Sequence, residues 1–124
     1  MRLTSTESET QKAIMQYLAA RHIFALRLNT GTFQNGKRFI RAHSAGAGAA
    51  DILAFPRRWY SDVEYGQLVP LLYPLWIEVK SAKGKQSAEQ KSFQQKVLSE
   101  GHLYCLARSV DDVERVLGQM GVNG

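Results

Sequence analysis

The run Trp76–Lys80 constrains this chain most, because it places two charged side chains inside an apolar strand. It reads Trp-Ile-Glu-Val-Lys. Side chains two residues apart in a β-strand point to the same face, so Glu78 and Lys80 are predicted to stand side by side while Ile77 and Val79 face the opposite layer. Unpaired charges on a strand buried on both faces are costly, which indicates that these two serve a purpose there.

A second carboxylate can join this pair, because Asp51 opens another apolar run, Asp51–Phe55. Two carboxylates beside an ammonium form a site for a hard metal ion and an activated water, and this chemistry hydrolyses phosphodiesters. Each piece also has a plainer interpretation. Asp often ends a turn ahead of a strand, and Glu-x-Lys is common on the solvated surface of basic proteins. The long segment between Asp51 and Glu78 does not prevent their strands from pairing, because loop-closure entropy grows slowly with length.

Size and charge set the remaining bounds. The 124 residues suffice for one compact core and are too few for two ordinary domains, so a single domain over residues 1–124 is expected. The net charge of +5 favours a polyanionic partner, although basic proteins also carry such charge without binding nucleic acid. The one cysteine, Cys105, lies in an apolar run, where a buried inert thiol is expected rather than a nucleophile. No signal region and no apolar span of roughly 18–20 residues is visible, so we expect a cytoplasmic protein without a membrane partner.

Apolar periodicity, capping residues and glycines divide the chain into elements. In the second long helix, Phe93, Val97 and Leu98 are expected on the buried face, and Gly46 and Gly48 are expected to allow a tight backbone approach before Asp51. The expected elements are a helix up to about Arg21, a strand Ile23–Asn29 with Lys37–Ala42 as its hairpin partner, a strand from Asp51, a strand Leu75–Lys80, a helix between Ser87 and Gly101, a strand Leu103–Ala107 and a last helix capped by Ser109.

Several motifs together resemble a known family. Asp51 followed by Glu78-Val79-Lys80 resembles the PD-(D/E)xK nuclease signature, and the rest of the chain, from about Glu7 to Leu117, resembles the VRR-NUC branch of stand-alone, phage or bacterial type. Ala50 departs from the family pattern, which has a proline there that presets the backbone and supplies no ligand. The accompanying motifs are Glu7-x-x-x-Gln11-x-x-Ile14, Asn29-Thr30-Gly31, Gly84-Lys85-x-Ser87-x-x-Gln90 and Val110-x-Asp112-Val113.

The resemblance implies an α/β fold with a restriction-endonuclease-like αβββαβ core, in which helices flank a central mixed four-stranded sheet. It also implies DNA cleavage that depends on Mg²⁺ or Mn²⁺, with no organic cofactor. The expected substrates are branched DNAs such as Holliday junctions or flaps, as in DNA repair, and stand-alone members resemble homodimeric junction resolvases. Carried onto this chain, it makes Asp51, Glu78 and the backbone carbonyl of Val79 metal ligands. Lys80 would orient or deprotonate the attacking water.

The first helix offers two glutamates for this site. Glu7, Gln11 and Ile14 lie on one stripe, which must face the sheet, so Glu7 is the preferred ligand, directly or through a water. Glu9 lies on a more polar flank. Either glutamate also fits a capping box, Glu7 with Thr4 and Glu9 with Thr6. Gln11 is expected to bind a metal-bound water or a phosphate, with a glutamine at the edge of the core as the alternative.

Four further residues complete the expected site. Gln90 is expected to hydrogen-bond the phosphate or hold Lys80, although Ser87-x-x-Gln90 is also a capping box. Lys83 and Lys85 are expected to contact phosphates, with ordinary solvated lysines as the alternative. The resemblance adds Asn29 to the substrate-binding set. His43 and His102 have no second ligand at metal spacing, so they are interpreted as surface or loop histidines.

Residues 56–74 are expected to be an insertion between two strands of the sheet. Its aromatic residues Trp59, Tyr60 and Tyr65 suit stacking on unpaired bases or packing against the domain or a second subunit, and packing is favoured. The insertion is also the candidate dimer interface. Two other functions stay open: a restriction-type or nicking nuclease on linear duplex, and a DNA-binding domain of the same fold without turnover. Little material is left in 124 residues for a base-reading module.

Overall fold

The computed structural model describes residues 6–35, 38–43, 46–62 and 64–122, and for residues 29–35 and 38–43 it describes the backbone. Within these ranges no helix is both long enough and apolar enough to cross a membrane. The helices are α1 (Glu7–Ala20), α2 (Ala88–Ser99) and α3 (Val110–Met120). The strands are β1 (Phe24–Arg27), β2 (Asn29–Asn35), β3 (Arg38–His43), β4 (Ile52–Phe55), β5 (Arg57–Asp62), β6 (Gln67–Leu72), β7 (Leu75–Val79) and β8 (Leu103–Ala107).

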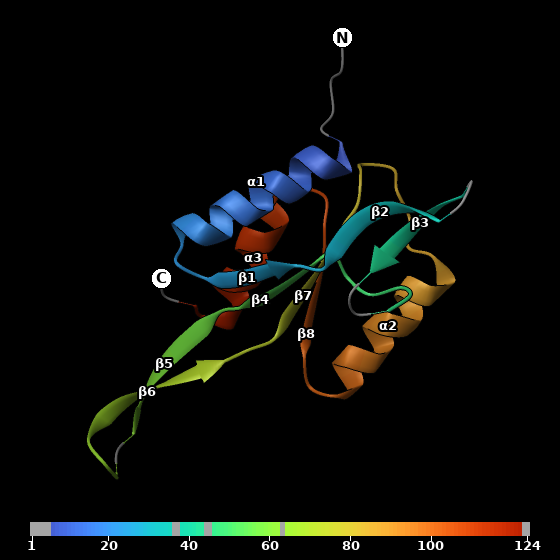
Figure 1. Ribbon diagram of the computed structural model, residues 1–124. Coiled ribbons are helices and arrows are strands. Elements are labelled where there is room, and N and C mark those ends of the chain that lie inside the picture. Colours follow the sequence, from blue (N-terminus) through green and yellow to red (C-terminus); the bar gives the residue numbers. More distant parts are fainter. Residues whose placement is uncertain (1–5, 36–37, 44–45, 63, 123–124) are drawn as a thin grey trace.

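A four-stranded sheet in the order β1-β4-β7-β8 forms the centre of the molecule (Figure 1). β1 and β4 pair antiparallel, as do β4 and β7, whereas β8 runs parallel to β7. The parallel pair requires a crossover, which α2 provides between β7 and β8. The sheet is therefore mixed, and α1, β1, β4, β7, α2 and β8 reproduce the expected αβββαβ order.

The pairing of the early strands differs from the expected hairpin. β1 pairs with β4, with Phe24 opposite Phe55 and Arg27 opposite Ile52, and the segment Arg38–His43 pairs with β2 instead. The prediction that Lys37–Ala42 is the partner of Ile23–Asn29 is therefore wrong. Composition identifies strand segments, but the partner is chosen by burial: in the central sheet β1 covers one side of β4, which is buried at alternate positions.

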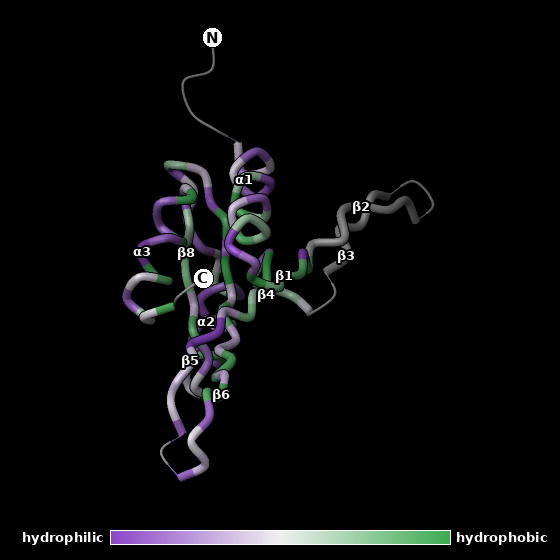
Figure 2. Tube along the Cα trace, turned by 90° about the vertical axis from the view of Figure 1, so that its left-hand side faces the viewer, coloured by the Kyte–Doolittle hydropathy of each residue, from purple (hydrophilic) through white to green (hydrophobic). Residues whose placement is uncertain are grey.

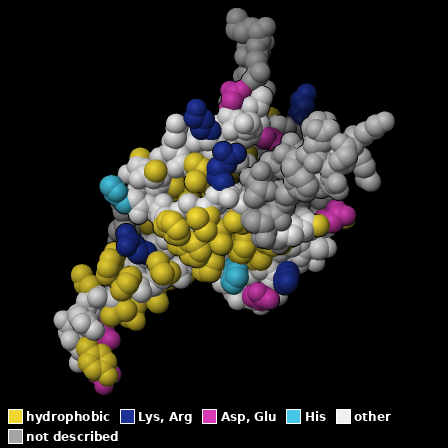
Figure 3. All heavy atoms as spheres, viewed as in Figure 1, with side chains coloured by type: hydrophobic (Ala, Val, Ile, Leu, Met, Phe, Trp, Pro, Cys, Tyr) yellow, Lys and Arg dark blue, Asp and Glu magenta, His cyan; other side chains and the backbone are white. Residues whose placement is uncertain are grey.

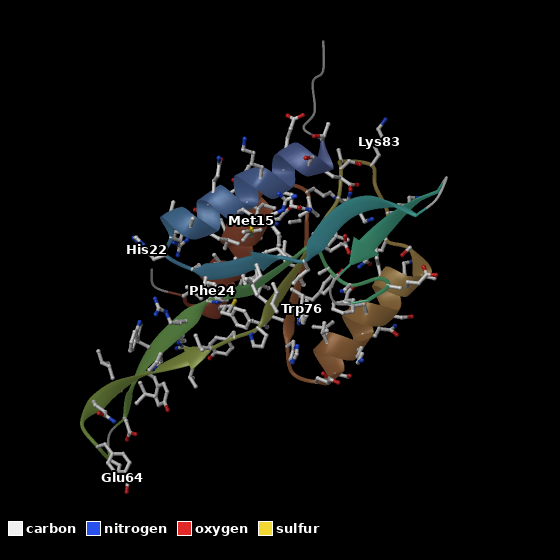
Figure 4. All side chains as sticks on the ribbon, viewed as in Figure 1. Met15, His22, Phe24, Glu64, Trp76 and Lys83 are labelled. Atoms are coloured by element: carbon white, nitrogen blue, oxygen red, sulfur yellow. The ribbon has the colours of Figure 1, made fainter. Side chains whose placement is uncertain are left out.

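The core lies between one face of the sheet and the helices α1 and α3, which contact each other. Ile14 and Leu18 of α1 and Leu117 of α3 are buried there against the sheet. α2 packs near the other face, where the Trp76 ring meets Phe93 edge-on at 5.0 Å and Val97 is buried (Figure 4). Leu98 is 49% exposed, so its predicted burial is wrong: a residue next to Val97 is turned by about 100° around the helix and leaves the narrow contact stripe.

The insertion at residues 56–74 forms an arm made of β5 and β6, which pair antiparallel and extend away from the sheet (Figures 1 and 2). Trp59, Tyr60 and Tyr65 stay exposed on this arm, and Arg57 lies over the Trp59 ring at 5.9 Å. Hydrophobic side chains run along the arm to its base in Figure 3. Packing of these aromatic residues against the domain body is therefore not observed, and packing against a second subunit stays a prediction.

Candidate active site

The charged residue of β7, Glu78, lies on the face opposite to the core. Ile77 and Val79 belong to the core cluster, as expected, while Glu78 is 2% exposed and faces the other way. The backbone of Asp51 continues the pairing of β4 with β7, because its N–H donates to the carbonyl of Ile77 at 3.1 Å. Its side chain returns to the same strand: Asp51 Oδ2 accepts from the N–H of Val79 at 2.8 Å. Two acidic residues far apart in the chain are thereby brought together.

A small polar pocket of about 160 Å³ opens where these strands meet α1 and α2. It collects polar and charged side chains from both helices and from the central sheet. The residues that line it are Glu7, Ser8, Gln11, Arg27, Asp51, Glu78, Lys80 and Gln90. Three acidic and two basic residues therefore share one cavity.

The surroundings of Glu78 in this pocket disfavour its charged form. Burial raises its pKa to about 8, helped by the negative charge of Asp51 and a hydrogen bond between the two carboxyl groups, while Lys80 opposes the shift and Glu7 adds slightly to it. Its Oε1 atom is buried and has no hydrogen-bond partner in the described part of the chain. A buried acceptor without a donor is rare and calls for an occupant.

A hard divalent cation fits this arrangement. Such ions prefer carboxylate oxygens, and a cation beside Asp51 would supply the partner that Oε1 of Glu78 lacks and remove the repulsion between the two carboxylates. The described residues hold no group of three or more His, Cys, Asp or Glu side chains arranged to bind a metal. Asp51 and Glu78 are thus the two side chains best suited to the ion, and a backbone carbonyl or water would complete its oxygen ligands.

Comparison with known proteins bears on the fold. No family model matches the sequence, and a search of curated proteins finds no match. A solved structure described as "VRR_NUC domain protein" superposes on 93% of this chain and 87% of its own, with a TM-score of 0.55 and 19% sequence identity. The chain has the VRR_NUC fold. This likeness confirms the expected α/β fold, in which helices flank a mixed four-stranded sheet.

Glu7 and Glu9 occupy different places in this VRR_NUC fold. Glu7 lines the pocket, and its Oε1 accepts from the N–H of Ser81 at 3.3 Å. Glu9 lies at the start of α1, where its N–H donates to Oγ1 of Thr6 at 3.1 Å and its carboxylate accepts from the same hydroxyl at 3.0 Å. Glu9 therefore serves as the capping partner. Thr4, the alternative partner of Glu7, lies outside the described residues.

Gln11 lies at the pocket but binds a residue that the sequence patterns did not indicate, Arg27. Its Oε1 accepts from Nε of Arg27, the last residue of β1, at 2.8 Å. Arg27 was missed because an arginine at a strand end usually faces solvent and because β1 was assigned the wrong partner. Pairing with β4 puts Arg27 opposite Ile52, next to Asp51. The polar stripe formed by Glu7 and Gln11 faces the sheet, so it could have indicated that a charged side chain of a neighbouring strand meets α1 here.

Gln90 serves as a cap and also lines the polar pocket. The N–H of Ser87 donates to its Oε1 at 2.8 Å, and its own N–H donates to Oγ of Ser87 at 3.1 Å. The amide nitrogen of the side chain takes no part in this capping box. The position of Gln90 is therefore compatible with both a capping role and a role in the site.

The loop after β7 presents the two predicted phosphate-binding lysines. Lys83 and Lys85 are exposed, and Lys83 extends away from the domain in Figure 4. A guanidinium nitrogen of Arg108 donates to the carbonyls of Ser81, Ala82 and Gly84, which pins the loop to the end of β8. Asn29 begins β2, and its side chain lies outside the described part of the structure.

The remaining titratable candidates lie away from this pocket. Cys105 is buried, and burial raises the pKa of its thiol to about 11, which agrees with an inert side chain. Nδ1 of His102 accepts from Nε1 of Trp76 at 2.9 Å, so this histidine is a packing residue beside α2. The side chain of His43 lies outside the described residues.

Proposed function

We propose that this chain is a divalent-metal-dependent endodeoxyribonuclease that cleaves branched DNA such as Holliday junctions or flaps. The observation that carries the proposal is the buried Glu78 carboxylate beside Asp51, with Lys80 in the same pocket. A binding module has no need to place two carboxylates in a pocket that an anionic strand must approach. The VRR_NUC fold supports a nuclease, and the net charge of +5 suits a DNA substrate.

The three acidic residues of the pocket, Lys80 and Gln90 each have a role in this proposal. Asp51 and Glu78, with the Val79 carbonyl, would hold Mg²⁺ or Mn²⁺, and Glu7 would reach the ion through a water; the ion, when bound, supplies Lewis-acid activation and offsets phosphate charge. The Lys80 amine orients the attacking water or takes its proton, and it stabilises the charge that builds on the phosphate. Water attacks phosphorus, and the bond to the leaving oxygen breaks. Gln90 contacts the phosphate or holds Lys80.

The preference for branched DNA and the homodimer rest on the family resemblance. Two copies related by a twofold axis would place two sites on opposite strands of a junction. The exposed β5–β6 arm is our candidate for the contact between copies. Replacing residues 57–72 by a short turn is expected to give a monomer by light scattering, and an unchanged dimer would refute this part of the proposal.

Cleavage of labelled four-way junction, flap and linear duplex tests the function. We expect cutting of the branched DNAs in Mg²⁺ or Mn²⁺, none in EDTA, and none by Asp51→Ala or Glu78→Ala, with DNA binding largely retained. Glu114→Gln is the matched control, because Glu114 is exposed on α3 outside the pocket. Full activity in either alanine variant would disprove the assignment, and preferential cutting of linear duplex would replace the branched substrate by the restriction-type alternative.

A further inference from the structure

The hydrogen bond between Arg27 and Gln11 holds a cationic side chain at a pocket that also contains three acidic residues. Arg27 is exposed, whereas Gln11 is 5% exposed, so the hydrogen bond joins a solvated guanidinium to a buried acceptor. The bond uses the Nε proton of Arg27. The two terminal amino groups, which carry four N–H donors, take no part in it.

The charge balance of the pocket gives this cation a purpose. Glu7, Asp51 and Glu78 would repel a DNA strand, and Lys80 and Arg27 are the basic residues that line the same cavity. An arginine presents a planar fork of donors that matches two phosphate oxygens, which a lysine does not. An arginine fixed through Nε keeps that fork available, so the observed contact prepares it for a phosphate.

Gln11 accounts for why the fork is held in place. A buried carboxamide oxygen must be satisfied, and Arg27 satisfies it at 2.8 Å, so the two side chains restrict each other. An exposed arginine otherwise loses up to about 2 kcal/mol of rotamer entropy when it is ordered on binding. Holding the guanidinium before DNA arrives removes part of that cost.

We infer that Arg27 binds a phosphate of the DNA strand that enters this pocket and that Gln11 is the positioning residue for its guanidinium. Gln11 then contacts the substrate through Arg27 rather than directly. The inference rests on the proposed function, because it takes DNA as the ligand. It adds one phosphate contact beyond the residues that the resemblance assigns.

The test is the salt dependence of DNA binding, measured on a four-way junction by fluorescence anisotropy in the Glu78→Ala background, where turnover is absent. We expect Arg27→Ala to weaken binding about tenfold and to reduce the slope of log K against log salt by about 0.9, the loss of one phosphate contact. Arg27→Lys should keep the slope and still bind several-fold more weakly, since it keeps the charge and loses the fork. Lys12→Ala removes an exposed cation of α1 outside the pocket and should leave both quantities nearly unchanged.

A double-mutant comparison tests the role of Gln11. Gln11→Leu should weaken binding in the presence of Arg27 and have no further effect in Arg27→Ala, and Gln11→Met repeats the comparison if the leucine variant melts early. An unchanged slope in Arg27→Ala, or independent multiplicative effects of the two substitutions, would overturn the inference, as would an absence of DNA binding. If Arg27 sets the slope but the unmodified protein cuts no DNA in any metal, the proposed nuclease fails and the phosphate contact stands.

Discussion

The backbone amide of Val79 donates a 2.8 Å hydrogen bond to Oδ2 of Asp51. This bond holds the Asp51 carboxylate against β7, at the residue that directly follows Glu78. The pair of acids therefore depends on the register of β4 and β7, in which Ile52 lies opposite Ile77. A slip of one residue would turn Glu78 into the core.

Without metal, the stability of the protein is expected to fall as pH rises from about 5 to 8. Burial raises the pKa of Glu78 to about 8, so in this window the folded state keeps a proton that the unfolded state has released. The free energy of unfolding should drop by at most about 1.4 kcal/mol per pH unit. Urea denaturation in EDTA at several pH values measures the slope. Glu78→Gln should remove most of this dependence, and an equal slope in that variant would locate the effect elsewhere.

A divalent cation should stabilise the protein more at pH 8 than at pH 5.5, because binding requires both carboxylates in their charged form. At a hundredfold excess over its Kd the ion adds about 2.7 kcal/mol to the free energy of unfolding. Thermal melts with and without Mg²⁺ or Mn²⁺ measure the shift. Asp51→Asn should show little shift at either pH, and a shift as large as that of the unmodified protein would exclude Asp51 as a ligand.

Gly48→Ala should destabilise the fold more than Gly46→Ala. Both glycines have positive φ, +78° and +95°, so each substitution costs about 1 kcal/mol of backbone strain. A Cβ at Gly48 would lie 2.4 Å from the carbonyl oxygen of Glu89 in α2, whereas one at Gly46 meets no described atom within 4 Å. We expect a total loss of roughly 3 kcal/mol at Gly48, measured by urea denaturation. An equal loss of stability in the two variants would show that α2 shifts to accommodate the added methyl group without a measurable free-energy cost.

Arg108→Ala should release the loop that carries Lys83 and Lys85. The Arg108 guanidinium donates hydrogen bonds to three loop carbonyls. Loss of these hydrogen bonds favours local unfolding of the loop. Limited trypsin digestion followed by mass spectrometry should show cleavage after Lys83 or Lys85 that is faster by roughly tenfold. Arg115→Ala is the control, because Arg115 is exposed and contacts Asp112 rather than the loop. Unchanged cleavage would mean that other contacts hold the loop.

Local patterns predicted the helices, the strands of the central sheet and part of the site, but not the strands β5 and β6 of the insertion. The alternation around Glu78 placed its charge opposite to Ile77 and Val79, because side-chain direction in a strand follows from sequence spacing alone. The Ser87 cap and its partner Gln90 were also visible, since a capping box spans three residues. The helical stripe brought Glu7 and Gln11 to the sheet for the same reason.

Short-range relationships, namely the faces of strands, the helix caps and the stripe of α1, therefore follow from the amino-acid order alone. Strand pairing became visible only in the folded molecule, where it brings Arg27 to the pocket and places Arg38–His43 beside β2. The bond between Asp51 and Val79 and the anchoring of the loop by Arg108 arise in the same way. These contacts join residues that are distant in the chain, and their partners are selected by burial and register, which no local pattern encodes.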